Sequence, residues 1–318
     1  MLEAIRTVFG AVATKDIVPI LTHILIYNGR MQAGDGCVTI DCNFPSDIKP
    51  CAVPGQKLLQ AVKGCGDEPG LSFTEGGKLA VKKGKFKAYL SVLPMEDFPV
   101  EKPDADRNKA PDDFIKVVQD LRPFVSKDAS RPWSMGILLK DGFAYATNNI
   151  ILVRQRIDWS GRDVIIPLRA LDDLITMKEN PLAIAGTDDS VTFFYRDSTW
   201  LKTQVLLSPW PDLAKILGSA KQPEDYVPPG FLDDVMKVKA FCSNVKFPQI
   251  TIGETVESDD GGDKAIVDGY NFPKGVFHAD HLTLVLQSAT KIDFSNFPAP
   301  CSFSNERGLF GVFVGVKS

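Results

Sequence analysis

The sequence predicts an α+β protein made of three tandem copies of one unit. Three apolar turns share a pattern in which a Pro or His is followed four residues later by a leucine. These leucines, Leu58, Leu171 and Leu282, are 113 and 111 residues apart. A second marker, Phe98-Pro99 and then Trp210-Pro211, repeats after 112 residues. A fixed spacing of this kind is typical of a repeated structural unit. The predicted domains are residues 1–104, 105–216 and 217–318.

Each copy begins with the pattern of an amphipathic helix. Apolar residues recur at intervals of three and four from Leu2, Phe114 and Phe231, which predicts one apolar stripe on each helix. Strand-like runs follow, separated by turns such as Asn28-Gly29 and Asp141-Gly142, which favour hairpins. A short helix then starts after the Pro or His, and further strands end the copy.

The strands and linkers are predicted from the same patterns. In the first copy the strands are residues 20–27, 37–42, 71–73, 78–81 and 86–93. In the second they are residues 135–139, 150–157, 191–195 and 200–207. In the third they are residues 250–252, 265–267 and 312–316. The linkers, rich in Pro, Asp and Lys, are residues 101–110 and 218–229.

Composition and charge exclude several classes of protein. The chain is 44% hydrophobic and 24% charged, which is typical of a globular protein and not of a disordered one. Its net charge of −4 excludes binding to nucleic acid through a large basic excess. No apolar run is long enough for a membrane span, and Met1–Arg6 lacks the pattern of a signal peptide. Six cysteines without a C-x-x-C pair predict reduced thiols in a cytoplasm.

No motif in the chain predicts catalysis, a metal or a cofactor. The segment His278–His281 offers two histidines but no third ligand at a suitable spacing, and Asp280 suits the first turn of a helix. Asp259–Asp263 is too irregular for a calcium loop and is predicted to be a hairpin tip. Walker, dinucleotide-binding and nucleophile-elbow motifs are absent from the sequence. We therefore expect a protein that is not an enzyme.

Four segments resemble the bacterial DNA polymerase III beta subunit, the sliding clamp. Val18–Ile26 is similar to the family's "LPIL-x-N" start, and Leu93–Pro99 to its "LP-x-x-D-F-P" segment. Ala146–Leu152 is similar to "ATDGHRL", and Pro211–Leu213 lies where the family has "FPDY". Two departures are that a helix pattern begins at Leu2, without the usual preceding strand, and that Asn148-Asn149 replaces Asp-Gly. The shorter domains fit a compact, bacteriophage-encoded clamp.

The resemblance implies a DNA-clamp fold and a role without bond chemistry. Three domains with inner helices and outer sheets form each chain, and two chains close head to tail into a ring around duplex DNA. Contacts to DNA would be to phosphates and independent of sequence. The expected compartment is the cytoplasm of a bacterium or of an infected host. Loop residues carried over as DNA-binding are Lys15, Lys127 and Arg131. Basic residues predicted on the helices are Arg6, Lys57, Lys63, Lys116, Arg122, Arg169, Lys178, Lys237 and Lys239.

The same resemblance implies a second site, an apolar cleft between the second and third domains. Replicative polymerases and clamp loaders would insert short peptides with apolar anchors there. Position by position, the match gives Thr147, Leu152, Pro211 and Ile216, with Val312, Val314 and Val316 of the C-terminal strand as the other wall.

Charge is distributed unevenly among the copies, which suggests a seam between two subunits. The first two copies are neutral, and residues 217–318 carry 9 basic and 13 acidic residues. We expect Lys83, Lys85 and Lys87 to face the acidic third copy of a partner chain, with Phe241 and Cys242 at the apolar part of the seam. Edge-strand lysines that only prevent aggregation are the alternative. The alternative function is a three-domain β-rich structural protein that does not encircle DNA.

Overall fold

The computed structural model describes residues 1–15, 17–66, 68–244, 246–259 and 263–316. The chain forms two compact units, residues 1–115 with 164–206 and residues 116–163 with 207–318, and each is described by itself. None of the helices in the described residues is long and apolar enough to cross a membrane. The predicted hairpin tip at Asp259–Asp263 includes residues 260–262, which lie outside the described part of the chain.

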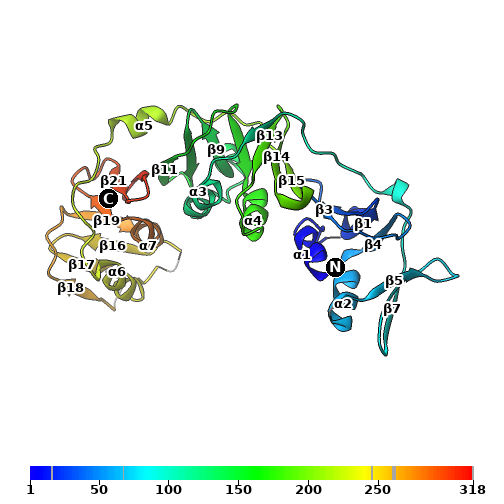
Figure 1. The fold of residues 1–318 in the computed structure, drawn as a ribbon. Coiled ribbons are helices and arrows are strands. Elements are labelled where there is room, and N and C mark those ends of the chain that lie inside the picture. The colour runs from blue at the N-terminus through cyan, green and yellow to red at the C-terminus, as the bar shows by residue number, and fades with distance from the viewer. Residues whose placement is uncertain (16, 67, 245, 260–262, 317–318) are drawn as a thin grey trace. The chain divides into compact units, whose positions relative to one another are not determined.

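The elements follow one order three times: a helix, four strands, a helix and three strands. The α+β class and the repeated unit predicted from the sequence are therefore confirmed (Figure 1). The helices are α1 (Leu2–Phe9), α2 (Gly55–Cys65), α3 (Phe114–Leu121), α4 (Leu168–Thr176), α5 (Ala214–Ser219), α6 (Phe231–Lys239) and α7 (Ala279–Ser288).

The strands of the first copy are β1 (His23–Tyr27), β2 (Arg30–Gly34), β3 (Val38–Asn43), β4 (Cys51–Pro54), β5 (Gly70–Phe73), β6 (Leu79–Lys83) and β7 (Phe86–Leu90). Those of the second are β9 (Gly136–Lys140), β10 (Phe143–Thr147), β11 (Ile151–Arg156), β12 (Val164–Pro167), β13 (Ala183–Gly186), β14 (Ser190–Phe194) and β15 (Trp200–Gln204), preceded by β8 (Arg107–Lys109). Those of the third are β16 (Gln249–Ile252), β17 (Thr255–Ser258), β18 (Ile266–Asp268), β19 (Gly275–His278), β20 (Lys291–Asp293), β21 (Cys301–Ser304) and β22 (Leu309–Phe313).

In the first unit, one sheet runs continuously from the first copy into the second. Its strand order is β4-β1-β2-β3-β15-β14-β13-β8, and β5-β6-β7 form a separate small sheet. Strands β3 and β15 join the two copies as an antiparallel pair, with Val38 opposite Thr203. Helices α1 and α2 pack on each other, and α1 also packs on β2 and β3.

The second unit contains an equivalent junction. Its larger sheet includes the order β9-β10-β11-β22-β21-β20, in which β11 and β22 pair antiparallel with Ile151 opposite Phe313. Strands β18-β17-β16-β19 form a separate sheet of the third copy. The core of the third copy includes Phe231 of α6. The centroid of its ring lies 4.9 Å from the ring centroids of both Tyr270 and Phe272.

Several predicted strand boundaries are wrong for local reasons. The first strand starts at His23 because Pro19–Thr22 form a 3₁₀ turn, in which the Thr22 hydroxyl donates to the Pro19 carbonyl at 2.7 Å. The last strand is Leu309–Phe313 and not 312–316. The predicted linkers are partly ordered, since 101–110 contains β8 and 218–229 starts within α5. The strands that the prediction missed are β2, β4, β8, β10, β12, β13, β17, β19, β20 and β21.

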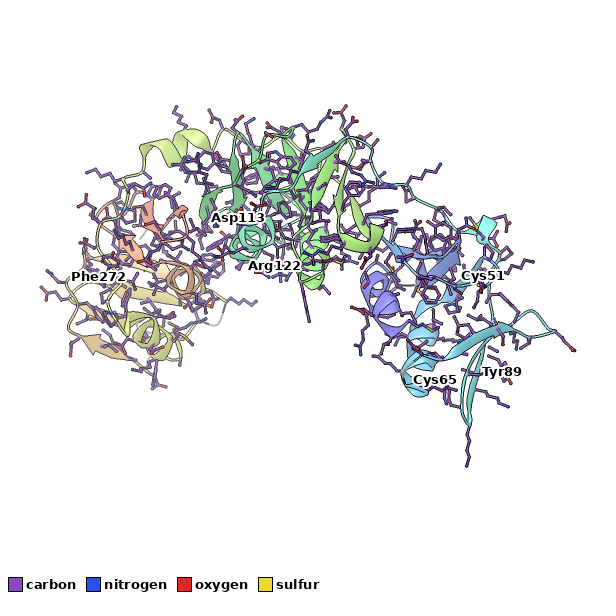
Figure 2. All side chains as sticks on the ribbon, viewed as in Figure 1. Cys51, Cys65, Tyr89, Asp113, Arg122 and Phe272 are labelled. Atoms are coloured by element: carbon purple, nitrogen blue, oxygen red, sulfur yellow. The ribbon has the colours of Figure 1, made fainter. Side chains whose placement is uncertain are left out.

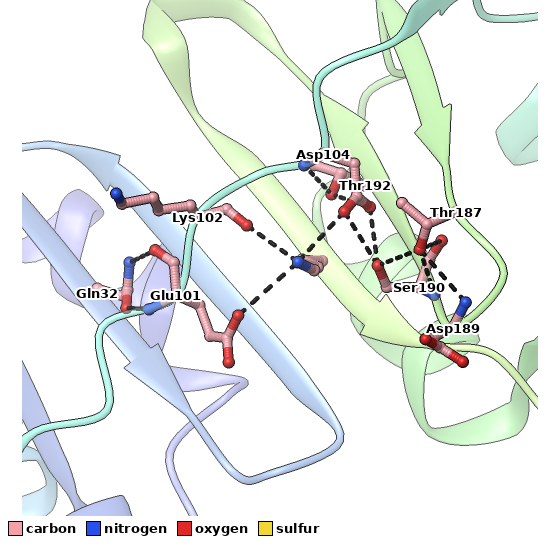
Figure 3. A network of polar contacts seen from close by, with 9 residues as sticks. Gln32, Glu101, Lys102, Asp104, Thr187, Asp189, Ser190 and Thr192 are labelled. Carbon is pink, nitrogen blue, oxygen red and sulfur yellow. Dashed lines mark hydrogen bonds and ion pairs between the residues drawn. The ribbon is translucent and has the colours of Figure 1, made fainter.

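The first linker is held by polar contacts within the first unit (Figure 3). Gln32 exchanges two hydrogen bonds with the backbone of Glu101, at 2.8 and 3.1 Å. The Lys202 ammonium lies 3.2 Å from the carboxylate of Asp104, and that carboxylate also accepts hydrogen bonds from Ser190 and Thr192. These bonds fix the connection between the first two copies beside the β3–β15 pair.

Arg169 of α4 ties the second copy to the first. Its guanidinium donates to Asp35 at 2.9 Å, to Asp173 at 2.5 Å and to the Gly10 carbonyl at 2.5 Å. Burial raises the pKa of Asp173 to about 6 despite the arginine beside it. A Cβ on Gly10 would lie 2.7 Å from the Asp173 carboxylate, so the close approach requires glycine at this position.

We predict that Arg169→Ala lowers the free energy of unfolding by about 2–3 kcal/mol, because it leaves the nearly buried Asp173 carboxylate without its counter-charge. A carboxyl group whose folded pKa is raised favours the folded state when it is protonated. The stability of the variant should therefore fall more steeply than that of the parent as the pH rises from 4 to 7. Urea unfolding across this range measures the effect, and Arg6→Ala, at an exposed position on α1, is the control. Equal losses for both variants would contradict the prediction.

Candidate DNA-binding, docking and seam sites

The basic residues predicted on helices are mostly exposed, but acidic groups partner several of them. Lys237 lies 2.8 Å from Asp234, and Lys239 lies 2.5 Å from Asp280. Arg169 is partly exposed, and its guanidinium donates to Asp35, Asp173 and the Gly10 carbonyl. The positions that are exposed are Arg6, Lys57, Lys63, Lys116, Lys178 and Lys237. Arg122 and Lys239 are partly exposed.

The predicted loop residues also lie at the surface. Lys15 is exposed after α1, and Lys127 and Arg131 are exposed in the loop between α3 and β9. That loop is shaped by Asp128, whose carboxylate accepts the Ser130 N–H at 2.9 Å and whose backbone carbonyl accepts the Arg131 N–H. Hydrogen bonds from Ser130 lower the pKa of Asp128, so the loop carries one fixed negative charge between its two basic groups. Its surplus of positive charge is therefore small.

The residues predicted for the peptide cleft gather around one apolar cluster in the second unit. Leu152 of β11 and Val312 of β22 lie opposite each other in the strand pair and are both buried. Leu217 of α5 and Phe310 complete the buried part of the cluster. The partly buried residues against it are Tyr145, Trp210, Leu213 and Ala220. Strand pairing and α5 thus place side chains from both the second and third copies in one cluster.

The other predicted cleft residues surround this cluster or support it. Thr147 is buried, and its hydroxyl donates to the Ile151 carbonyl at 2.7 Å, which shapes the β10–β11 turn. Pro211 is exposed, Ile216 is 43% exposed and Val314 is 38% exposed. Val316 is partly buried, and its N–H donates to the Val276 carbonyl at 2.8 Å.

Sequence reasoning missed the aromatic part of this surface. The rings of Trp133 and Trp210 meet edge to face with centroids 5.4 Å apart, and Tyr145 lies 6.4 Å from Trp210. The indole N–H of Trp210 is buried without a hydrogen-bond partner. Arg154 stacks between the rings of Phe143 and Phe310, at 5.2 and 5.4 Å. The sequence contained a signal, since Trp210 stands in the predicted repeat marker.

The residues predicted for the seam lie on the β6–β7 hairpin and just after α6. Lys83 ends β6, Lys85 lies in the turn and Lys87 lies on β7, and all three are exposed. Phe241, just after α6, is 50% exposed. Cys242 is partly buried, and its thiol donates to the Gln249 carbonyl at 3.2 Å. Burial raises the pKa of this thiol, which favours its neutral form.

The two histidines at the start of α7, His278 and His281, lie side by side with their rings tilted by 33°. Their ring centroids are 4.6 Å apart, and burial lowers the pKa of His281, which favours its neutral form. Across the described ranges, no group of three or more His, Cys, Asp or Glu side chains could hold a metal ion.

Comparisons with known proteins agree with this geometry at the level of the fold. Comparison of the sequence with protein-family models gives no match, and comparison with curated proteins gives none. Solved structures do match: the DNA polymerase sliding clamp of Bacillus subtilis has a TM-score of 0.84 at 16% identity, over 100% of this chain and 97% of that one. The sliding clamp of Caulobacter crescentus has a TM-score of 0.83 at 19% identity, with the same coverage.

A third similar structure is the DNA polymerase III beta subunit of Bartonella birtlesii bound to griselimycin, with a TM-score of 0.85 at 19% identity over 100% of this chain and 97% of that one. All of these matches extend over the whole described chain and include its three repeats. The chain therefore has the fold of the bacterial DNA polymerase III beta sliding clamp.

Proposed function

We propose that this protein is a sliding clamp, a processivity factor that encircles duplex DNA and tethers a replicative polymerase to it. The observation that carries the proposal is the clamp fold itself, complete over all three repeats at TM-scores of 0.83 and 0.84 to the clamps of C. crescentus and B. subtilis. The clamp performs no bond chemistry and binds no cofactor. It acts in the cytoplasm of a bacterium or of an infected host.

A homodimer closes the ring in this proposal. Within the described residues, β7 and β18 are end strands of their sheets, although their counterparts in the other copies are paired across a junction. An end strand presents backbone N–H and C=O groups that another chain can pair with. In a dimer, β7 of each chain can pair with β18 of the other chain. These two pairings leave neither edge open. The exposed apolar residues Phe86, Tyr89 and Ile266 on these strands support the pairing.

The charge of the helices suits DNA that slides and is not gripped. Lys57, Lys63 and Lys116 are exposed, and ion pairs reduce the net charge around Lys237 and Lys239. Phosphate contacts made by such a surface are weak, independent of sequence and sensitive to salt. Retention on DNA then depends on the closed ring and not on affinity.

The apolar cluster around Leu152 and Val312 is the proposed docking site for polymerase and clamp-loader peptides. It combines buried aliphatic groups with partly exposed aromatic ones, the composition of a peptide-anchor site. A C. crescentus sliding clamp has been solved with polyethylene glycol bound to its putative beta-motif tethering region.

We predict that the protein, once loaded by a clamp loader onto nicked circular DNA, stays bound through gel filtration at high salt and is lost when the circle is cut. Ring topology and not electrostatic affinity holds it, so salt that screens phosphate contacts has little effect. The control is the same protein incubated with the circle without a loader. Equal retention on circular and linear DNA would contradict encirclement.

We predict that Val314→Asp weakens griselimycin binding at least about tenfold, because a carboxylate must be desolvated against an apolar ligand. Calorimetric titration of the parent and variant measures the change. Val18→Asp, at an exposed valine of the first copy, is the matched control and should bind like the parent. The docking assignment is wrong if both variants match the parent, or if the parent itself does not bind.

A further inference from the structure

We infer that two chains join in one register. In this register Ala88 of β7 lies opposite Ala265 of the other chain, and Lys85 lies opposite Asp268 at the mouth of an acidic, aromatic cavity. The inference rests on the proposed ring. It goes further by naming the residues that meet and the group that fills the cavity. It follows from the repeat, because the chain already forms the same junction twice within itself.

The two internal junctions share one register. Val38 and Ile151 each lie five residues before the end of their strands, at Asn43 and Arg156. Across the junctions, Val38 is opposite Thr203 and Ile151 is opposite Phe313. Thr203 and Phe313 correspond because each lies opposite a fully buried residue of its own hairpin, Val191 in one and Cys301 in the other. The backbone geometry of the repeated copy therefore sets the register. The particular side chains at one junction do not set it.

The free strand β18 can be aligned with β11 through its hairpin. Asp268 pairs with the first residue of β17, as Arg156 pairs with the first residue of β10. Val267, opposite the buried Val256, thus corresponds to Gln155, opposite the buried Ala144.

The free strand β7 can be aligned with β22 in the same way. Both strands have five residues, Phe86–Leu90 and Leu309–Phe313. The last residue of each lies opposite the first residue of its hairpin partner, which is Leu79 in one sheet and Cys301 in the other. Phe86 therefore corresponds to Leu309.

The register of the subunit seam then follows from β11 and β22, where Gln155 is opposite Leu309. Val267 corresponds to Gln155 and Phe86 corresponds to Leu309, so Val267 lies opposite Phe86 at the seam. Counting along the antiparallel strands sets Ala265 opposite Ala88 and Asp268 opposite Lys85. Phe86, 40% exposed, gains an apolar neighbour, and the opposite charges lie together on the other face of the strands.

Charge alone does not choose this register. A slip of two residues in either direction would keep the same faces together and would set Lys83 or Lys87 opposite Asp268 in place of Lys85. The repeat geometry selects Lys85, and the neighbouring lysines add to the attraction in every case. Which of the three lysines lies opposite Asp268 therefore tests whether the seam has the register of the internal junctions.

The cavity beside Asp268 suits the ammonium group that this register brings to it. It has a volume of about 610 Å³ and is lined by acidic and aromatic residues of the third copy. Among the described residues that line it, the acidic ones are Asp225, Asp268 and Asp293, and none is a lysine or arginine. The nearby Lys291 ammonium lies 4.8 Å from the centroid of the Tyr226 ring in the lining of the cavity. Tyr270 and Phe272 stack in its wall with centroids 5.6 Å apart. Figure 2 labels Phe272 in this region and Tyr89 on β7. Carboxylates and aromatic faces together favour a lysine side chain.

Disulfide mapping tests the register. In a background with Cys37, Cys65 and Cys242 changed to Ser, the pair Ala88→Cys with Ala265→Cys should form an oxidised covalent dimer, because residues directly opposite have Cβ atoms about 4.5–5.5 Å apart. The matched pairs are Leu90→Cys with Ala265→Cys and Phe86→Cys with Ala265→Cys, which report a slip in each direction. The first pair should cross-link at least about tenfold faster than the other two, since diagonal neighbours lie about 7–8 Å apart.

Faster cross-linking of either slipped pair overturns the register, as does a dimer by light scattering in which no pair cross-links. Both results leave the proposed ring intact. A monomer at all concentrations overturns the ring itself, so the two failures are distinguishable.

A charge swap tests the cavity. Lys85→Glu should weaken the dimer about tenfold, and adding Asp268→Lys to the same chain should restore it, because the reversed pair attracts again. Lys78→Glu, an exposed lysine before β6, is the control. No restoration in the double variant would overturn the Lys85–Asp268 contact.

Discussion

The hydrogen bonding of strand edges is the constraint on which the rest of this structure depends. Each unit of the repeat ends in strands whose backbone groups need partners. Within the chain, β3 meets β15 and β11 meets β22, so one sheet continues from copy to copy. Within the described residues, β7 and β18 are end strands whose counterparts in the other copies are paired. In the proposed dimer, assembly therefore repeats a junction that folding has already made.

Side chains adjust these junctions to their separate tasks. At the first junction, the Arg169 contacts and the Gln32–Glu101 bonds add polar links between the two copies. At the second, an apolar cluster with Leu152, Val312 and Trp210 leaves aromatic groups partly exposed. The first junction is therefore linked by polar contacts, and the second carries the proposed peptide-docking site. At the proposed subunit seam, charge complementarity fixes the orientation of partners and adds modestly to their affinity.

The fold could be predicted from the sequence to the extent that it depends on local patterns. Turn motifs at a constant spacing predicted the three copies, and apolar periodicity predicted α1, α3 and α6. Strand β2 escaped prediction because its buried Gln32 is satisfied by Tyr27, Asp41 and Glu101, contacts that no alternation of polar and apolar residues reveals. The predicted C-terminal strand lies too far toward the C-terminus, because the apolar run continues past Phe313, the last residue that pairs with β11.

The sites were harder to predict because their partners are distant in the chain. Arg169 looks like any basic helix residue in the sequence, yet Asp35 and Gly10, which engage it, lie 134 and 159 residues away. Leu152 and Val312 were found through the family resemblance. Leu217 and Phe310 were missed because only the fold brings α5 and β22 against β11.

Amide hydrogen exchange of the edge strands tests the central claim most directly. The account predicts that outward-facing amides of β7 and β18 are protected at high protein concentration and lose this protection when dilution dissociates the dimer. Strand β5, at the opposite edge of the β5-β6-β7 sheet, should exchange equally fast at both concentrations. Exchange in β7 and β18 that is as fast as in β5 at every concentration, in a protein that is dimeric by mass, would contradict the account.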